Sequence, residues 1–162
     1  MPPSAVSQDS ERTKIMEAAY RILAANEGAA ISIAGVLSAA ELSTRAFYRH
    51  FDSKDGLLLA MFRRDADLVL VELQTAAAAA PNATEALRAW IGGMLRLPGD
   101  PRRRRRALVL DSTEVNRAKG YRGERARYEA AEVAALAQIL HRGHADGSFP
   151  LARPAADAAY IR

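Results

Sequence analysis

The sequence of 162 residues contains no cysteine. This absence excludes disulfide bonds, zinc sites built on thiolates and cysteine nucleophiles. A reducing compartment is compatible with it, and we expect a cytoplasmic protein. The sequence also has no apolar run long enough for a membrane span, and residues 1–10 lack the apolar stretch of a secretion signal. We therefore expect no contact with a membrane.

Catalytic patterns are missing as well. No nucleophile–base pair, no metalloprotease-type HExxH motif and no glycine-rich phosphate loop is recognisable. We therefore expect that the protein is not an enzyme and uses no cofactor. An all-α enzyme stays as a remote alternative that a turnover assay would test.

The alternation of apolar and polar residues that is typical of strands is also missing, whereas alanine, leucine, glutamate and arginine are frequent. With 49% hydrophobic residues the chain can bury a core. We predict an all-α fold that begins with a three-helix, helix-turn-helix head. The expected helices run from the stripe Ile15, Ala18, Ala19, Ile22 and Leu23 to about residue 26, then over 33–39, 43–51, 54–79, 87–95, 102–118 and 121–144, with a last one beginning at Pro154.

Residues 32–54 are the most informative part of the chain. Ser32 and Ser43 are suited to cap two short helices separated by residues 40–42, which is the layout of a helix-turn-helix. On a helical wheel, the second of these helices has an apolar face with Ala46, Phe47 and Phe51. The opposite face carries Thr44, Arg45, Tyr48 and Arg49, whose side chains can bind phosphates and base edges in a major groove. An ordinary amphipathic helix with a solvated basic face is the plainer alternative. Net charge does not decide between the two, because residues 1–56 have no excess of basic side chains.

The same region resembles the head of the tetracycline-repressor (TetR) family. The resemblance rests on Gly28, Ser32-Ile33, Val36, Ala40, Leu42-Ser43, the block 47–51 (Phe-Tyr-Arg-His-Phe), Ser53-Lys54-Asp55 and Leu57-Leu58. It implies a DNA-binding domain over residues 1–56 with a flexible N-terminal arm. A long fourth helix would join this domain to a helical ligand-binding and dimerisation domain over 57–162. The residues expected to contact DNA are Ser43, Thr44, Arg45, Tyr48, Arg49, His50 and Lys54.

The expected DNA contacts differ in kind, and two positions depart from the family's pattern. The resemblance gives Tyr48 and Lys54 phosphate contacts, and Lys54 stands at a helix start, where free N–H groups would bind the same anion. His50 falls near the apolar face of the wheel, so it would reach the DNA backbone only from the helix end. Glu41 stands where the family's turn usually has glycine, so either this residue is left-handed, at a cost of about 1 kcal/mol, or the turn has another geometry. Ala34 offers no polar side chain, so base reading should rest on Thr44, Arg45 and Arg49.

In the resembled family, the later helices enclose an effector pocket. The residues expected to line it here are Phe62, Trp90, Met94, Leu110, Glu114 and Tyr128, although packing in a core explains each apolar one equally well. Two other features have plainer explanations. The arginine run 102–106 points all round a helix axis and is expected to be solvated, with an accessory DNA contact as the alternative. His141 and His144 lie three apart, but they lack a third ligand, so no metal site is expected.

The resemblance therefore predicts a sequence-specific transcriptional regulator, most simply a repressor that a small-molecule effector releases from DNA. The alternative is a DNA-binding regulator controlled by a protein partner without a ligand. A double-stranded, pseudo-palindromic operator implies a homodimer, since two heads must span two half-sites. The family has two further long helices that pair across the dimer axis. Because the sequence ends at Arg162, soon after Pro154, we expect that these C-terminal helices are truncated here.

Overall fold

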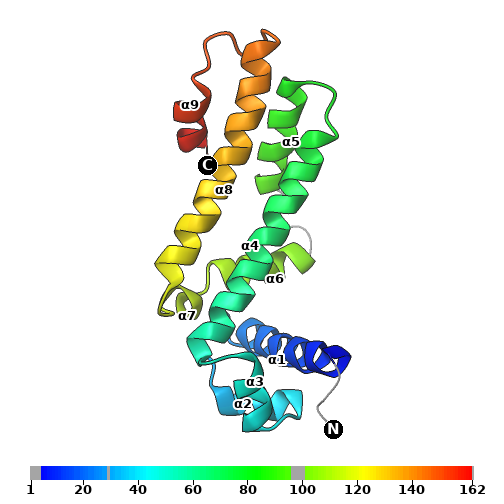
Figure 1. Cartoon of the computed structure of the whole chain (residues 1–162), viewed down its shortest axis with the longest axis vertical. Helices are drawn as coiled ribbons and strands as arrows, with labels where there is room; N and C mark the ends of the chain where they lie inside the picture. Colours follow the sequence, from blue (N-terminus) through cyan, green and yellow to red (C-terminus); the bar gives the residue numbers. More distant parts are fainter. Residues whose placement is uncertain (1–4, 29, 96–100, 162) are drawn as a thin grey trace. The chain divides into compact units, whose positions relative to one another are not determined.

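The computed structural model describes residues 5–28, 30–95 and 101–161, and every regular element in these ranges is a helix. The predicted all-α fold, a helix-turn-helix followed by a long fourth helix and a further helical part, is confirmed (Figure 1). In chain order the helices are α1 (Ala5–Ala25), α2 (Ile33–Ala40), α3 (Thr44–His50), α4 (Lys54–Ala78), α5 (Ala83–Leu95), α6 (Pro101–Leu110), α7 (Thr113–Asn116), α8 (Tyr121–Ala145) and α9 (Pro154–Ile161).

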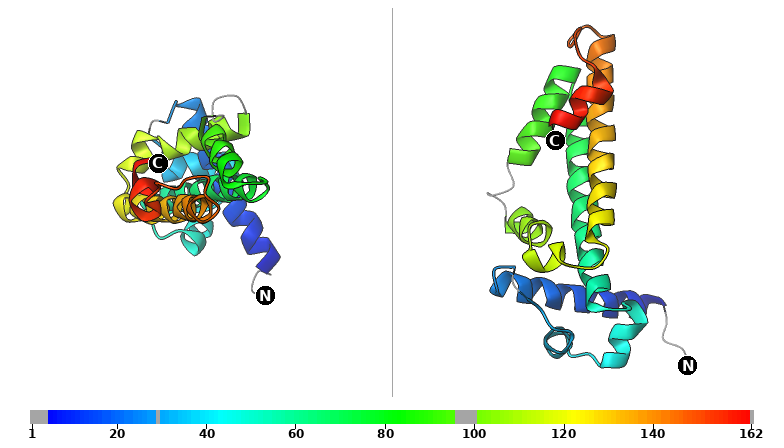
Figure 2. Two further views of the ribbon diagram at one scale, coloured as in Figure 1. Left: turned by 90° about the horizontal axis from the view of Figure 1, so that it is seen from above. Right: turned by 90° about the vertical axis from the view of Figure 1, so that its left-hand side faces the viewer.

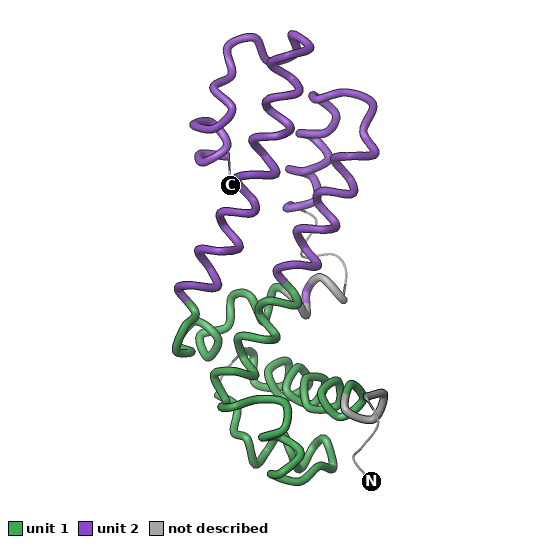
Figure 3. Tube along the Cα trace, in the orientation of Figure 1, with its two compact units in different colours: residues 1–65, 105–121 green, residues 66–104, 122–162 purple. Residues whose placement is uncertain are grey.

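The chain divides into two compact units (Figure 3). Unit 1 comprises residues 1–65 and 105–121, and unit 2 comprises residues 66–104 and 122–162. Helix α4 is continuous and contributes its first half to unit 1 and its second half to unit 2. The compact units therefore do not coincide with the domains 1–56 and 57–162 that the sequence suggested, and that functional boundary stays a prediction.

In unit 1, α1 packs against both α2 and α3. Its buried side chains recur at helical spacing and include Ile15, Ala19 and Leu23, which are at most 1% exposed. On α3, Phe47 is completely buried and its ring lies 5.6 Å from that of Phe51. Burial of one phenylalanine side chain contributes about 1.5–3 kcal/mol. The apolar stripe read from the sequence is thus the face that joins the three helices of the head.

Three serines cap the starts of α2, α3 and α4 through the same kind of hydrogen bond. The side-chain oxygen of Ser32 accepts a hydrogen bond from the Gly35 amide (3.0 Å) at the start of α2. Ser43 does the same at α3 and Ser53 at α4, where the acceptor distances are 3.2 and 3.0 Å. Each bond satisfies one of the free N–H groups of a helix start. The caps predicted at Ser32 and Ser43 are confirmed, and Ser53 caps α4 with the same kind of bond.

Of the two alternatives for the turn between α2 and α3, the structure has the left-handed residue. Glu41 is left-handed, with φ 55° and ψ 43°, and its amide bonds to the carbonyls of Leu37 and Ser38. Gly28, after α1, takes the same kind of conformation with φ 81°, which costs a glycine little. For a residue with a Cβ atom the left-handed region costs about 1–2 kcal/mol. The turn is therefore formed at some expense in stability.

A single helix over residues 102–118, as expected from the sequence, is wrong. The structure has α6 up to Leu110, and α7 begins anew at Thr113. Ser112 leaves helical geometry with ψ 128° and its side-chain oxygen caps α7. Its hydroxyl also donates to the carbonyl of Gly28 (2.8 Å), and Ser112 is only 3% exposed. The interruption is explained by this bond, because it ties the segment to the turn after α1.

In unit 2, the second half of α4 lies side by side with α5 and α8 (Figures 1 and 2). Helix α8 runs parallel to α4: Arg127 donates to Asp67 near the beginning of this contact (3.0 Å), and Ile139 and Ala77 line one cleft further along. Helix α5 runs in the opposite direction, and its Gly93 lies against the tip of the Leu73 side chain of α4, which would have to move to admit a Cβ atom.

Two glycines of α8 provide a test of this packing. A Cβ atom at Gly143 would overlap the ring of Phe149 and lie 3.0 Å from the Cβ of Ala83, whereas a Cβ atom at Gly123 meets nothing within 4 Å. We expect Gly143→Ala to lower the free energy of unfolding by about 1–3 kcal/mol through overpacking. Gly123→Ala is the matched control and should raise it by about 0.5–1 kcal/mol through helix propensity. Urea unfolding followed by circular dichroism measures both. Equal effects of the two variants would contradict the close contact at Gly143.

The strain at Glu41 gives a second prediction. Glu41→Gly should raise the free energy of unfolding by up to about 1 kcal/mol, because glycine adopts a positive φ at little cost. The melting temperature should rise by roughly 2–4 °C in a domain of this size. Glu41→Ala keeps a Cβ atom while it removes the carboxylate, so it controls for the charge. If the alanine variant gains as much stability as the glycine variant, the gain comes from the charge and not from the backbone.

Candidate nucleic-acid interface

The outward face of α3 carries the side chains that the helical wheel predicted. Thr44, Arg45 and Tyr48 are exposed, whereas Ala46 and Phe47 are 2% and 0% exposed. Tyr48 is 56% exposed, and its ring packs edge-on against Phe47 at 5.4 Å. The aromatic contact orients a large side chain whose hydroxyl is free to meet a ligand. The face therefore offers a hydroxyl, a guanidinium and a phenol next to each other on a rigid helix.

Ser43, just before this helix, is exposed and uses its side-chain oxygen as an acceptor in the cap. A hydroxyl can donate and accept at the same time. The hydrogen of Ser43 therefore stays available to an acceptor such as a phosphate oxygen.

Arg49 and His50, the last two residues of α3, are both held by a carboxylate of α1. The Nη2 atom of Arg49 lies 2.9 and 2.7 Å from the two carboxylate oxygens of Glu11. The Nε2 atom of His50 lies 3.1 Å from Glu11 Oε2. The His50 side chain is 8% exposed, against 37% for Arg49. Of the two, only the arginine presents substantial surface to a ligand.

The sequence reasoning missed Glu11. Helical spacing places Glu11 one turn before Ile15, on the side of α1 that becomes buried, but it does not identify the partner of the carboxylate. Arg49 first and His50 second lower the pKa of Glu11 below its ordinary value. A carboxyl group with a lowered folded-state pKa stabilises the fold above its unfolded pKa. That contribution is lost as pH falls through the lowered value.

Lys54 lies in the first turn of α4, and its ammonium group meets a carboxylate from α7. The Nζ atom donates to Glu114 Oε1 at 2.5 Å. Next to it, Asp55 accepts a bond from the backbone amide of Lys119 (3.1 Å). The Lys54 side chain keeps 39% of its surface exposed. The segment after α6 thus pairs with the helix start at which a DNA phosphate was expected.

The residues expected around an effector belong to both units. Phe62, Leu110 and Glu114 are in unit 1, where Phe62 is fully buried and its ring lies 5.2 Å from that of Tyr121. Glu114 pairs with Lys54, as described above. Trp90, Met94 and Tyr128 are in unit 2, and Trp90 is 2% exposed.

Trp90 also lines an open cleft of about 140 Å³ in unit 2. None of the other five expected pocket residues lines this cleft. Its lining consists of Gln74, Ala77, Ala78, Trp90, Ala135, Gln138, Ile139 and Arg142. Tyr128 instead bonds to the buried Glu132, and burial first and this carboxylate second raise the pKa of its phenol above the ordinary value.

The remaining features noted in the sequence form no further site. In the described ranges, no group of three or more His, Cys, Asp or Glu side chains is placed to hold a metal ion, and His141 and His144 are exposed. Of the arginine run, Arg104 is exposed, and the other four side chains lie outside those described. No helix in the described part of the chain has the length and apolar character needed to cross a membrane.

Comparisons with known proteins identify the head. Residues 15–61 match the sequence model of the family described as bacterial regulatory proteins, tetR family. This stretch covers the later part of α1, the helix-turn-helix and the start of α4. No curated protein matches the chain in sequence.

Solved structures of the same fold extend the likeness to most of the chain. Reduced NemR of E. coli is 19% identical with a TM-score of 0.71, and the match covers 93% of this chain and 81% of that one. A TetR family transcription regulator from Marinobacter aquaeolei VT8 is 23% identical with a TM-score of 0.68, and the match covers 89% and 73%. AibR in complex with isovaleryl coenzyme A and operator DNA is 18% identical with a TM-score of 0.67, and the match covers 93% and 81%.

These matches agree with the capped helix-turn-helix, the exposed polar face of α3 and the long α4. Residues 15–61 thus match the bacterial regulatory proteins of the tetR family, and the chain shares the fold of the solved structures named above.

Proposed function

We propose that the protein is a sequence-specific transcriptional regulator, and that it represses until a small-molecule effector releases it from DNA. The observation that carries this proposal is the outward face of α3, where Thr44, Arg45 and Tyr48 lie exposed on a helix whose other side is fixed in the core. In a helix-turn-helix, this second helix enters the major groove. The operator would be double-stranded DNA, and it would be pseudo-palindromic if two heads bind it.

The roles of the individual residues follow from their chemistry and exposure. Thr44 and Arg45 stand at the N-terminal end of α3, which is the end that reaches base edges in this motif. Ser43 and Tyr48 have hydroxyls suited to phosphate oxygens, and these contacts would place the helix without reading sequence. Arg45 is exposed and forms no ion pair with any residue that the structure describes, so its guanidinium is available. His50 is too buried to be a principal contact and would act from within the head.

Lys54 would bind a phosphate at the start of α4. A cation there opposes the helix dipole, but the free N–H groups of the first turn and the ammonium would serve the same anion. To reach the phosphate, the Lys54 ammonium must either bind Glu114 and the phosphate together or break its contact with Glu114. The Glu114 side chain is only 13% exposed, so sharing the ammonium between carboxylate and phosphate costs less than leaving the carboxylate unpaired.

The proposed effector rests on a relative, and the proposed dimer rests on the geometry of an operator with two half-sites. AibR has been crystallised with both isovaleryl coenzyme A and operator DNA. For this chain we propose a mostly apolar effector site in unit 2, with Trp90, Met94 and Tyr128 as candidate lining residues. A homodimer would place two copies of α3 one DNA turn apart. An effector would act by favouring a spacing of the two heads that does not fit the operator.

Selection of bound sequences from a random DNA pool tests DNA binding directly. On the selected site, Arg45→Ala should weaken binding by about 1–3 kcal/mol, because one good base contact has this value. Binding to scrambled DNA should change much less. Arg88→Ala is the matched control, since Arg88 is an exposed arginine on α5 that pairs with Glu85. Electrophoretic mobility shift at constant salt measures the affinities of the parent and both variants for the two DNAs. An Arg45→Ala variant that binds the selected site as tightly as the parent would remove Arg45 from the base-reading set.

Lys54→Ala should instead weaken binding to every sequence alike. The slope of log affinity against log salt should flatten by about 0.9, the contribution of one phosphate contact. Lys119→Ala is the control, because it removes the same charge in unit 1 while the backbone bond to Asp55 is kept. Fluorescence anisotropy over a series of salt concentrations gives the slopes. If the slope of the Lys54→Ala variant equals that of the parent, Lys54 does not touch the DNA backbone.

A further inference from the structure

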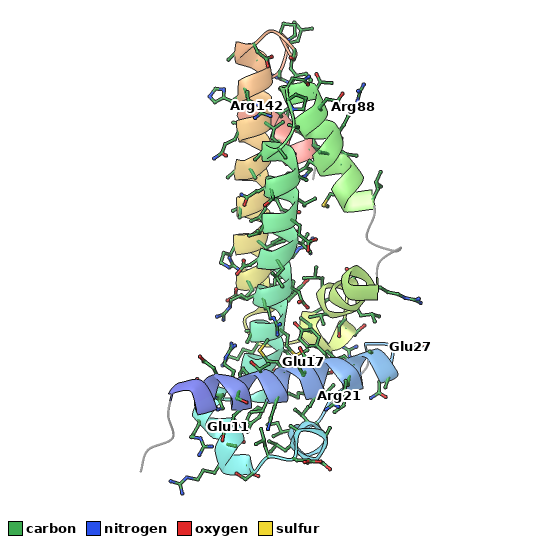
Figure 4. All side chains as sticks on the ribbon, turned by 90° about the vertical axis from the view of Figure 1, so that its right-hand side faces the viewer. Glu11, Glu17, Arg21, Glu27, Arg88 and Arg142 are labelled. Atoms are coloured by element: carbon green, nitrogen blue, oxygen red, sulfur yellow. The ribbon has the colours of Figure 1, made fainter. Side chains whose placement is uncertain are left out.

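Glu11 is an acidic residue within the face that the proposed function directs toward DNA. It belongs to α1, and Figure 4 labels it beside the helix-turn-helix. Its carboxylate contacts the last two residues of α3, at 2.7 Å from Arg49 and 3.1 Å from His50. A negative charge close to DNA repels phosphates and weakens binding to every sequence. Glu11 therefore helps DNA recognition only if it improves a property other than the overall affinity for DNA.

The carboxylate is held in place from the inside of the head. An ionised carboxylate only accepts hydrogen bonds, so the Nε2 atom of His50 must carry the proton and donate to it. The His50 side chain is 8% exposed and therefore has little freedom to turn away. Beside it, the guanidinium of Arg12 lies 5.4 Å from the centre of the Phe51 ring, which is a second link between α1 and the end of α3. Glu11 is thus a fixed acceptor.

The contact with Glu11 leaves part of the Arg49 guanidinium unused. Both carboxylate oxygens bind the same nitrogen, Nη2. The N–H groups on Nη1 and Nε take no part in this contact. The Arg49 side chain is 37% exposed, so these donors can reach a ligand. The bond to Glu11 therefore anchors the Nη2 end of the Arg49 guanidinium. The N–H groups on Nη1 and Nε are held in a defined position as a result.

We propose that Glu11 is a positioning residue that sets DNA specificity by fixing Arg49. This inference rests on the proposed DNA-binding function. A free arginine can follow a phosphate or a base acceptor on almost any sequence, whereas an anchored one fits acceptors in one arrangement only. The carboxylate reduces affinity for all DNA and raises the ratio between the right site and the wrong ones. Discrimination of this kind arises when the competing complex is made worse.

The test compares three variants on the DNA that the parent selects and on scrambled DNA of the same length and salt. Glu11→Ala removes both contacts. Glu11→Gln keeps an acceptor oxygen but removes the charge. Asp9→Asn is the matched control, because Asp9 is an exposed acid on the same helix and the change alters the net charge equally. The readout is the ratio of the two affinities, together with a melting curve for each variant.

We expect Glu11→Ala to lower the ratio about tenfold, with scrambled DNA bound as tightly as by the parent or more tightly. Glu11→Gln should keep part of the ratio. Asp9→Asn should tighten binding to both DNAs alike and leave the ratio unchanged. If Glu11→Ala also tightens both alike, Glu11 is only a competing charge and the inference is wrong.

A merely structural role is distinguished by the same data. Equal weakening on both DNAs with a lower melting temperature in Glu11→Ala and Glu11→Gln would overturn the inference. Failure of the proposed function has a different signature. If the parent protein enriches no sequence from the random pool, sequence-specific DNA binding is overturned, and this inference with it. A parent that selects a site and Glu11 variants that keep the ratio overturn this inference alone.

Discussion

The candidate DNA-binding surface depends on the burial of one face of α3. A helix of seven residues is not stable by itself in water, because nucleation costs more than its few hydrogen bonds return. Here Ala46 and Phe47 are buried where α3 packs on α1 and α2. This packing fixes both the helix and its rotation about its own axis. Thr44, Arg45 and Tyr48 are exposed as a consequence, since they lie on the opposite side.

The second constraint is electrostatic. The head has no general excess of positive charge, so its attraction to DNA must come from the placement of single groups. Two of the expected cations are paired within unit 1, Arg49 with Glu11 and Lys54 with Glu114. The side chains of the two cations are exposed to nearly the same extent, 37% for Arg49 and 39% for Lys54. The pairs differ in that Glu11 has a second partner in the buried His50.

Local patterns predicted the local structure of the head. The caps at Ser32 and Ser43 depend on neighbours within a few residues, and both were predicted from the sequence. The contacts that the sequence did not reveal join distant residues. Glu11 meets Arg49 from 38 positions away, and Ser112 meets Gly28 from 84. No periodicity records such a pairing, because either partner alone resembles an ordinary surface residue or helix residue.

The segment 105–121 shows how such a pairing changes the interpretation of the chain. By sequence it falls among the helices expected to bind an effector, yet it belongs to the compact unit of the head. Three contacts attach it there: Ser112 to the turn after α1, Glu114 to Lys54, and the Lys119 amide to Asp55. Two of these end on the first turn of α4. In the proposed regulator, a change in this segment would therefore reach a candidate phosphate contact through direct bonds, without any need to bend the long helix.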